Sequence, residues 1–477
     1  MGKSLKACRA CVVVLGDIGR SPRMQYHVKS LSETCCFVDL IGYLESKPQE
    51  DLMSKSNVRI HALSLFPELN LPNSLKYIFK TIWQALTLLI ALISIKKPNF
   101  ILCQNPPAIP SLAVCQLYCI FVRSTKIIID WHNYTHTILA INSTQNTSFV
   151  KFAKMIERYF GKKASASLCV TRAMQQDLQE NWNITATVLY DRPPTHFRPS
   201  SISEDHKLFL RLSRNIQEFD GNSLNSTDEN IIENASLFTV QYVDGTIKYR
   251  HDRPGLLISS TSWTPDEDFS ILLSALDLYD KKASEDPTLF PCLICVITGK
   301  GPLKEYYRLL IKDKAWKKVS IATPWLENDD YPKLLAAADL GVCLHYSSSG
   351  FDLPMKVVDM FGCGLPVCAI KFNCLYELVQ HGRNGWVFET SAELSGQLEH
   401  WFYKFPNNTS IIDEKQRINK QLEQFQQLRW SENWENIVKP CLEQLLIVNN
   451  DFSLKYIPCV ILFGIDYTLS LWSIYNS

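Results

Sequence analysis

The sequence lacks an excess of charge of either sign. Its 477 residues include 49 basic and 48 acidic ones, which gives a formal net charge of +1 at pH 7. Because nucleic acids are bound through concentrated basic surfaces, this balance argues against a nucleic-acid partner. The 16 cysteines lack the paired spacing of a zinc site. Many of them lie within apolar runs, so we expect reduced thiols buried in the core of a cytosolic chain.

The sequence also begins without the pattern of a secretory signal. The first ten residues are basic, and the apolar run after them, Cys11–Leu15, has about the length of a buried strand. Residues 81–95 carry no charge and are flanked by lysines, but they are shorter than the roughly 20 residues that span a bilayer. A buried crossover helix and a helix at a membrane interface both fit this segment. Residues 456–472 are apolar too, but Asp466 interrupts them, so a spanning helix is not favoured there.

What the sequence does contain is a regular alternation of short apolar strands with helical patterns, which is typical of parallel β-α-β units. Strands are predicted at 11–15, 36–42, 58–63, 100–104, 126–130 and 167–171, and again at 255–261, 293–299, 319–323, 340–345 and 365–370. We therefore predict an α/β fold of two doubly wound Rossmann-like domains that face each other across a cleft. The expected bounds are 10–199 for the first domain, 200–250 for a polar linker with a loop insertion, 251–445 for the second domain with closing helices, and 446–477 for an apolar tail of unknown role.

The turn after the first predicted strand has features of an anion site. Open parallel sheets bind ligands at the carboxyl ends of their strands. Gly16 and Gly19 would let backbone N–H groups approach a ligand, and Arg20 and Arg23 would add charge to the start of the next helix. The third glycine of the dinucleotide fingerprint is missing, so an ordinary strand–turn–helix is the competing interpretation.

A polar and aromatic cluster follows the fifth predicted strand: Asp130, Trp131, His132, Asn133 and Tyr134. Aromatic faces stack on sugars and polar groups bind their hydroxyls, so this composition favours sugar recognition. His132 could serve as a general base, because histidine is the side chain that most often takes this role. The competing interpretation is a structural histidine, but the crowding of functional side chains weighs against it.

Two stretches of the second half suit a nucleotide diphosphate. Gly299, Lys300 and Gly301 lie between a predicted strand and a helix, where backbone donors and one cation would meet a pyrophosphate. An ordinary turn has the same pattern.

The second of these stretches, 347–368, begins with a polar loop that includes Ser349 and Gly350 and continues into a helix. Lys356 and Asp359 are three residues apart, so they share one helix face. The lysine would neutralise phosphate, and the carboxylate would accept hydrogen bonds from ribose hydroxyls. A Lys–Asp pair on a solvated face is the alternative, but the apolar neighbours argue for a buried helix.

Taken together, these motifs resemble one family. The chain is similar to the chitobiosyldiphosphodolichol β-mannosyltransferases over roughly residues 10–440. The resemblance is carried by the segments 13–27, 104–107, 130–134, 260–264, 266–270, 297–302, 323–325, 347–368 and 428–430.

The resemblance implies a GT-B fold, GDP-mannose as donor and GlcNAc2-diphosphodolichol as acceptor, at the cytosolic face of the endoplasmic reticulum membrane. It implies inverting transfer of the first mannose, with a β-1,4 bond, in lipid-linked oligosaccharide synthesis for N-glycosylation. The membrane surface, and neighbouring mannosyltransferases of the same pathway, would be further partners. Asp17 and His132 are the candidate catalytic bases, since inverting GT-B enzymes usually draw the base from the first domain. Asp359 falls at a donor-binding glutamate position, but the matching first glutamate is replaced by Phe351, so no paired role is carried over.

Two departures from the family bear on function. Family members usually begin with a membrane-spanning helix, whereas this chain starts almost at the first strand, so membrane contact would rest on residues 81–95 or on the tail. Thr135-His136-Thr137 stands where the family commonly has Gly-Tyr-Ser. No Asp-x-Asp motif lies at a suitable strand end, so neither a divalent metal nor another cofactor is firmly implied.

Other functions remain open at this point. The fold would also suit a nucleotide-sugar epimerase, or a transferase with another donor or acceptor. The lysine-flanked segment 81–95 argues against an epimerase. A non-catalytic relative that binds a nucleotide sugar or scaffolds other transferases is the main alternative. It is disfavoured by the joint presence of Gly16, His132, Lys300, Lys356 and Asp359.

Overall fold

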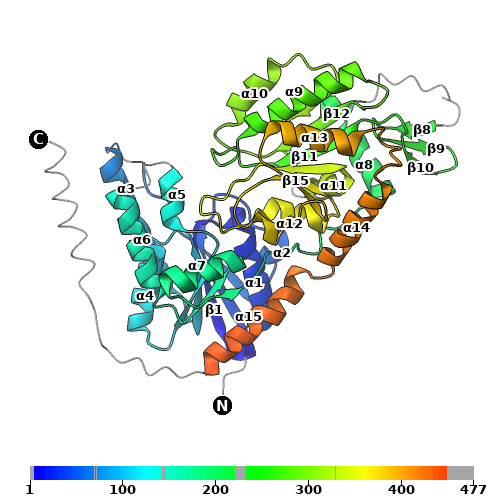
Figure 1. The fold of residues 1–477 in the computed structure, drawn as a ribbon. Helices are drawn as coiled ribbons and strands as arrows, with labels where there is room; N and C mark the ends of the chain where they lie inside the picture. The colour runs from blue at the N-terminus through cyan, green and yellow to red at the C-terminus, as the bar shows by residue number, and fades with distance from the viewer. Residues whose placement is uncertain are drawn as a thin grey trace, which may run out of the picture.

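Two parallel sheets with helices packed against them make up most of the computed structural model (Figure 1). It describes residues 5–68, 70, 72–141, 147–220, 232–327 and 329–447. The predicted α/β fold with two Rossmann-like domains is confirmed. The candidate membrane segment at 456–472 lies outside the described residues.

The first sheet has seven strands in the order β3-β2-β1-β4-β5-β6-β7, and its neighbouring strands run parallel. The strands are β1 (Arg9–Asp17), β2 (Phe37–Tyr43), β3 (Val58–Ala62), β4 (Phe100–Asn105), β5 (Lys126–Trp131), β6 (Ala166–Cys169) and β7 (Thr187–Val188). All six strands that were predicted for the first domain are present. The seventh strand, β7, is too short to give a sequence signal. The strand order reverses between β1 and β4, and ligands of such sheets bind beyond the strand ends at this point.

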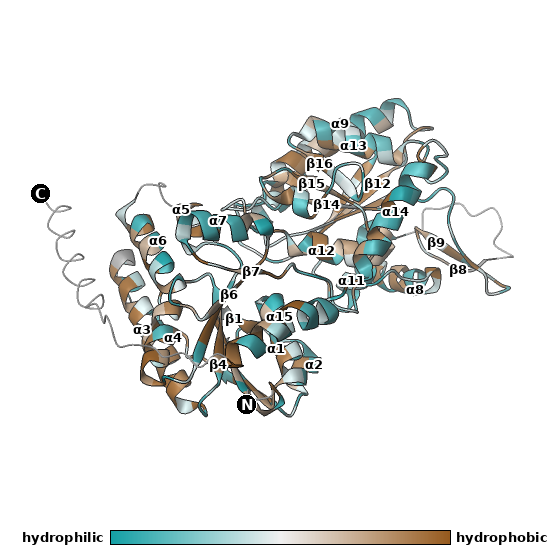
Figure 2. Cartoon of the chain, turned by 60° about the horizontal axis from the view of Figure 1, so that its bottom comes forward, coloured by the Kyte–Doolittle hydropathy of each residue, from teal (hydrophilic) through white to brown (hydrophobic). Residues whose placement is uncertain are grey.

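Residues of β1 alternate between two cores, because successive side chains of a strand point to opposite faces. Cys11 and Val13 belong to one buried cluster, and Ala10 and Val12 to the other. The first face is covered by α3 (Asn73–Ser94), α4 (Ser111–Phe121) and α7 (Arg172–Trp182), and the second by α1 (Pro22–Thr34), α2 (Glu50–Met53) and α15 (Trp430–Ile447). Of two further helices, α6 (Ser148–Gly161) lies beside α4, and α5 (Thr135–Ile141) lies beside α6. Figures 1 and 2 show these two groups of helices on opposite sides of the sheet.

Helix α3 is longer than its uncharged sequence segment, because it begins at Asn73 and includes Lys76 and Lys80. Its stretch Leu75–Ser94 is long and apolar enough to cross a membrane by length and composition.

The second sheet has six parallel strands in the order β13-β12-β11-β14-β15-β16. They are β11 (Gly255–Ser260), β12 (Leu293–Thr298), β13 (Val319–Ala322), β14 (Leu340–Cys343), β15 (Val367–Ile370) and β16 (Gly385–Phe388). The five predicted strands form, and β16 is an addition. The packed helices are α9 (Phe269–Glu285), α10 (Lys304–Lys312), α11 (Asp330–Ala337), α12 (Met355–Gly362), α13 (Ser391–Phe402) and α14 (Ile412–Gln426).

The segment predicted as a polar linker is more ordered than its composition indicates. Its described part contains α8 (Ile202–Leu212) and an antiparallel sheet of β8 (Ile232–Ala235), β9 (Thr239–Tyr242) and β10 (Ile247–Tyr249). Three buried aromatic side chains, Phe209, Phe219 and Phe238, pack together beneath it. These residues are separated by polar segments, so the sequence pattern does not predict that they form one cluster.

The last described helix returns to the first domain. After α14, which contacts α12, α15 buries Trp430, Trp434 and Val438 in the core cluster that contains α1 and β1. Trp430 packs against Tyr26, with ring centroids 5.6 Å apart. Helix α15 therefore completes the hydrophobic core of the first domain.

Candidate active site

A buried carboxylate, Asp130, lies at the end of β5 and is bound by three side chains through four nitrogen atoms. Arg23 binds it with two parallel bonds, of 2.8 Å to Oδ2 and 2.9 Å to Oδ1. His27 Nε2 lies 3.1 Å and His132 Nε2 2.7 Å from Oδ2. Burial alone would raise the pKa of Asp130, but Arg23 and the two histidines lower it well below its usual range. Asp130 is therefore an ionised centre that orients both imidazoles.

The tautomer of His27 follows from its other neighbour. The indole Nε1 of Trp434 lies 3.0 Å from His27 Nδ1. An indole N–H only donates, so Nδ1 accepts and Nε2–H donates to Asp130. Burial lowers the pKa of His27 in spite of the adjacent carboxylate, which keeps this ring neutral.

The tautomer of His132 follows from the same carboxylate. Its Nε2 faces ionised Asp130 and must carry a proton, so Nδ1 of the neutral ring holds the free lone pair. Within the described residues, Nδ1 has no hydrogen-bond partner. The side chain is 21% exposed. An oriented histidine with an unoccupied nitrogen is the arrangement that a general base requires.

The other candidate base, Asp17, serves the local backbone. Its Oδ1 accepts hydrogen bonds from the N–H groups of Gly19, Glu45 and Ser46, at 3.0 to 3.3 Å. Burial alone would raise the pKa of Asp17, but these bonds lower it. A carboxylate with a lowered pKa is a weaker base, so this environment favours His132.

The two arginines of the first turn differ from the anion-site prediction. Arg23 is buried and also binds Asp191, 2.7 Å away, so its charge is neutralised internally. Arg20 is mostly exposed and lies 3.6 Å from Asp17. A Cβ at Gly16 would meet only Val14 at 3.9 Å, whereas the space at Gly19 is filled by Ser46. Only Gly16 leaves open space beside the strand end.

The predicted aromatic sugar platform does not form. Trp131 and Tyr134 are buried, and the Tyr134 ring stacks on Trp182 with centroids 4.8 Å apart. The Tyr134 hydroxyl donates to Asp177, 2.6 Å away. These aromatic residues stabilise the core, because Trp182 of α7 covers them.

In the second domain, the glycines after β12 are required by a neighbouring loop. A Cβ at Gly299 would lie 1.8 Å from the carbonyl oxygen of Thr261, and one at Gly301 would lie 1.7 Å from that of Ser262. Lys300 stands with its Nζ 3.8 Å from the ring centroid of Trp325. The glycines thus bring two strand-end loops together, and Lys300 remains at the surface of this junction.

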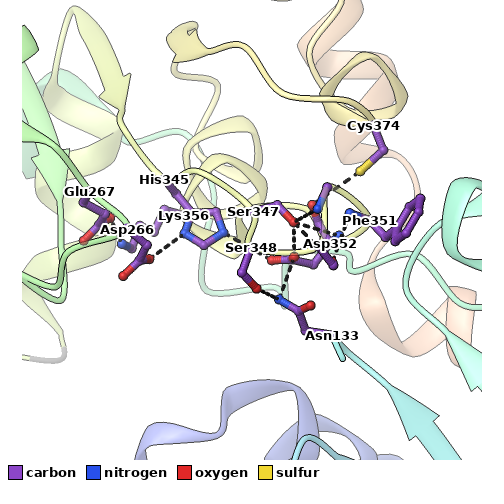
Figure 3. A network of polar contacts seen from close by, with 12 residues as sticks. Asn133, Asp266, Glu267, His345, Ser347, Ser348, Phe351, Asp352, Lys356 and Cys374 are labelled. Carbon is purple, nitrogen blue, oxygen red and sulfur yellow. Dashed lines mark hydrogen bonds and ion pairs between the residues drawn. The ribbon is translucent and has the colours of Figure 1, made fainter. Parts of the chain in front are cut away.

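Lys356 does not pair with Asp359. Its Nζ forms a short ion pair with Oε1 of Glu267, which is buried (Figure 3). Glu267 also accepts from the Thr261 hydroxyl at 2.5 Å and the Ser262 N–H at 2.9 Å. Glu267 was missed by sequence reasoning, because 89 residues separate it from its partner.

Asp359 points to a different environment. The residue is half-buried, and its carboxyl group has no hydrogen-bond partner in the described part of the chain. Burial, followed by the charge of Asp191, raises the pKa of Asp359 well above its usual value. A carboxyl group left without a partner in such a place is available to accept hydrogen bonds from a ligand.

A second missed group, His345, stands just beyond β14 (Figure 3). Its Nδ1 lies 3.3 Å from Asp266 and its Nε2 3.2 Å from Asp352. Burial alone would lower its pKa, but the hydrogen bonds and charges of these carboxylates raise it to about 9. At neutral pH the ring is a cation that joins two loops.

The two domains meet through this network. Asn133, which follows β5, donates to Ser348 at 3.1 Å and to Asp352 at 2.9 Å. The Thr171 hydroxyl donates to the carbonyl of Phe351 at 2.6 Å. Asp352 therefore binds both His345 of its own domain and Asn133 of the other. We call the region formed by the ends of β5, β11, β12 and β14 and the start of α12 the interdomain site.

Phe351, which stands where related enzymes have a glutamate, makes a contact between the domains. Its ring packs against Tyr134 of the first domain, with centroids 6.0 Å apart. The preceding Gly350 has a φ of +77° and accepts a turn that L side chains rarely adopt, while Ser349 accepts a bond from the Phe351 N–H at 3.2 Å. This loop is therefore shaped for contact between the domains.

The described residues contain no group of three or more His, Cys, Asp or Glu side chains placed to hold a metal ion. The cysteines of the described residues form no disulfide with one another, and most of them are buried, as their apolar neighbours in the sequence indicated.

Comparisons with known proteins agree on one class. Residues 248–416 match the family described as Glycosyl transferases group 1. A crystal structure of Anabaena Alr3699/HepE with UDP and glucose superimposes with a TM-score of 0.61 at 14% identity, covering 92% of this chain and all of that one. The structure of WaaG, a glycosyltransferase involved in lipopolysaccharide biosynthesis, gives a TM-score of 0.57 at 11% identity over 92% of this chain and all of that one. These structures share the GT-B fold of this chain, and the matched family is one of glycosyltransferases.

Sequence relatives narrow the class. The mouse protein named chitobiosyldiphosphodolichol β-mannosyltransferase is 45% identical over 92% of this chain and 89% of its own length. The human protein of that name is 45% identical, with 90% and 91% covered. An Arabidopsis relative, named UDP-glycosyltransferase TURAN, is 42% identical, with 92% and 98% covered. The chain belongs to the chitobiosyldiphosphodolichol β-mannosyltransferase family, and the family resemblance seen in its motifs is confirmed.

Proposed function

We propose that this enzyme transfers mannose from GDP-mannose to chitobiosyldiphosphodolichol, with inversion and a β-1,4 linkage. The observation that carries the mechanism is the pair His132–Asp130 on one side of the interdomain site, with Lys356 and Asp359 on the other. The names of the relatives support the acceptor. The donor nucleotide rests on the same family and on the second-domain residues.

His132 is the proposed base. Its Nδ1 takes the proton of the acceptor hydroxyl as that oxygen attacks the anomeric carbon of mannose. The bond between this carbon and the diphosphate oxygen breaks, and GDP leaves with the electron pair. Asp130 holds Nε2–H and stabilises the imidazolium that forms. A single displacement of this kind inverts the anomeric configuration.

The second domain is proposed to bind the donor. Asp359 accepts hydrogen bonds from the ribose hydroxyls, which its lack of a protein partner favours. Lys356, next to the start of α12, and Lys300 neutralise the diphosphate. Lys356 is already paired with Glu267, so donor binding would shift this lysine between two anions.

We also propose the place of action. The acceptor named for the relatives carries a dolichol chain, which lies in a membrane, so the enzyme works at a membrane surface. The described cysteines form no disulfide with one another, which agrees with the reducing, cytosolic side of the endoplasmic reticulum.

The test is transfer from labelled GDP-mannose to a synthetic GlcNAc2-diphosphate lipid by the purified chain. A parallel reaction contains UDP-glucose or UDP-N-acetylglucosamine, because one relative is named for a UDP donor. We expect a product only with GDP-mannose, sensitive to β-mannosidase and resistant to α-mannosidase. Transfer from a UDP-sugar alone would replace the proposed donor, and binding of GDP-mannose without any product would favour a non-catalytic relative.

A further inference from the structure

We propose that the outer side of the first domain between residues 72 and 163 docks in the plane of an anionic membrane. This surface, formed by α3, α5, α6 and the end of α4, is called the α3–α6 face. The inference deepens the proposed function and rests on it in one respect, because that function supplies a membrane lipid as acceptor. Two independent features of the face, its apolar exposure and its charge, point to lipid.

The α3–α6 face is unusually apolar. More than half of the large hydrophobic side chains left exposed in the described part of the chain lie between residues 72 and 163. Figures 1 and 2 show α3, α4 and α6 side by side on the outer side of the sheet. Exposed hydrophobic surface of this extent marks a site of association. The most exposed side chains are Tyr77 at 72%, Ile90 at 63% and Ile93 at 67% on α3, Phe121 at 78% at the end of α4, and Phe149 at 59% on α6.

The charges of the face are of one sign. Between residues 72 and 163 the sequence has two acidic residues, Asp130 and Glu157, and both are fully buried. The exposed lysines of the segment make no ion pair with any residue that the structure describes. They include Lys76, Lys80, Lys96, Lys97, Lys151 and Lys154. Because the whole chain is almost neutral, this is a local concentration of cations, and anionic headgroups are its complement.

Helix α3 is held flat against the domain. Leu88 and Leu92 are fully buried in the core cluster of the first sheet, whereas Ile90 and Ile93 face outward. Of the most apolar part of the helix, within Leu75–Ser94, only 11% is buried. A helix that spans a bilayer would have to leave this core, so α3 lies along the interface with its outer side among the acyl chains.

The face also leads to the interdomain site. Helix α5 begins at Thr135, three residues after His132, and it exposes Ile138 and Ile141. An acceptor whose polyprenyl chain remains in the bilayer could therefore present its sugars near His132. An acidic protein partner would match the lysines but would not explain apolar side chains of this exposure on the same helices.

The test is flotation of the full chain with phosphatidylcholine vesicles, with or without about 30% phosphatidylserine. Two double variants alter the face, Ile90→Asp with Ile93→Asp, and Lys151→Glu with Lys154→Glu. Matched controls on the second domain are Leu309→Asp, exposed at 64%, and Lys312→Glu with Lys317→Glu. We expect each face variant to lower partitioning into anionic vesicles by about tenfold or more, since each basic residue near such a surface contributes about fivefold. The controls should bind as the unaltered chain does.

A second readout separates this inference from the proposed function. Face variants should lose transfer to a long-chain acceptor in vesicles but keep transfer to a short-chain acceptor in solution. If the unaltered chain transfers to neither acceptor, the proposed function fails while flotation still tests the face. Equal flotation of face variants and controls, or no preference of the unaltered chain for anionic vesicles, overturns the inference.

Discussion

The indole nitrogen of Trp434 lies 3.0 Å from Nδ1 of His27, although 407 residues separate them along the chain. Through His27 this contact reaches Asp130, and through Asp130 it reaches His132. The orientation of the proposed base is therefore coupled to the last described helix.

Replacement of Trp434 tests this coupling. Trp434→Phe keeps an aromatic ring but removes the donor, so His27 is no longer held in one tautomer. We expect kcat to fall about tenfold, the value of one lost hydrogen bond, and the pH profile of kcat to shift. Trp430→Phe is the matched control, because Trp430 donates to Ser30 at 3.2 Å and not to the imidazole. Equal losses in both variants would show that packing of α15, and not the hydrogen bond, is responsible.

The choice of base is tested by a pair of substitutions. His132→Ala should lower kcat by about 10² to 10⁴, the range for a removed general base, with GDP affinity unchanged. Asp17→Asn should keep most activity, because an amide oxygen can still accept the three backbone bonds. Steady-state kinetics and GDP titration measure both variants. The opposite ranking of the two kcat values would assign the base to Asp17.

His345 predicts a stability window in pH. Folding raises its pKa from an ordinary 6.5 to about 9. The stabilisation from its two carboxylate partners is therefore complete below about pH 6.5 and is lost as pH rises through 9. We expect the free energy of unfolding to fall across this window by at most about 3 kcal/mol. Denaturant unfolding of the unaltered chain and of His345→Gln, which should show a flatter dependence, measures it.

Asn133 is predicted to control the contact between the domains. Asn133→Asp would place a carboxylate where the amide now donates to Asp352, so like charges would face each other across the interdomain site. We expect a larger radius of gyration in small-angle scattering and a rise in KM for both substrates of about tenfold, the loss of one charge-assisted bond. Asn181→Asp is the control, since Asn181 also donates to an aspartate, Asp177, but within one helix. A compact Asn133→Asp variant with normal KM would contradict this role.

Asp359 should exchange stability for binding. Its raised pKa means that its charge destabilises the folded chain at neutral pH. Asp359→Asn should therefore raise Tm by about 1 to 3 °C, while it weakens GDP binding by about tenfold or more. Calorimetry and thermal unfolding of the same preparation measure both effects. A loss of stability together with unchanged GDP affinity would mean that Asp359 is a structural residue.

The sequence was sufficient for most of the fold, because apolar runs of four to seven residues bounded by polar turns mark buried parallel strands. It failed at β7, which has only two residues, and in the segment before β11, where single phenylalanines meet only after folding. Strand-end positions also pointed to the region of His132 and of Lys356 as the candidate site, since topology places such ends together.

The sequence alone could not predict which side chains these residues contact. Nothing local distinguishes an arginine that binds phosphate from Arg23, whose two carboxylates come from β5 and from the segment after β7. Tyr134 reads as a surface aromatic until α7 covers it. His345 and Glu267 act through residues of other loops, so their roles depend on distances in space and not on spacing in sequence.

The position of α15 has a consequence for biosynthesis. Trp434 and Val438 fill the same core as β1, so the first sheet to leave the ribosome is the last to be finished. Until those residues emerge, His27 has no indole donor and the apolar side of α1 is uncovered. A chain that stops before Trp430 would thus lose the proposed active centre, although Asp130 and His132 would already be synthesised. The first 199 residues would not form an independent folding unit.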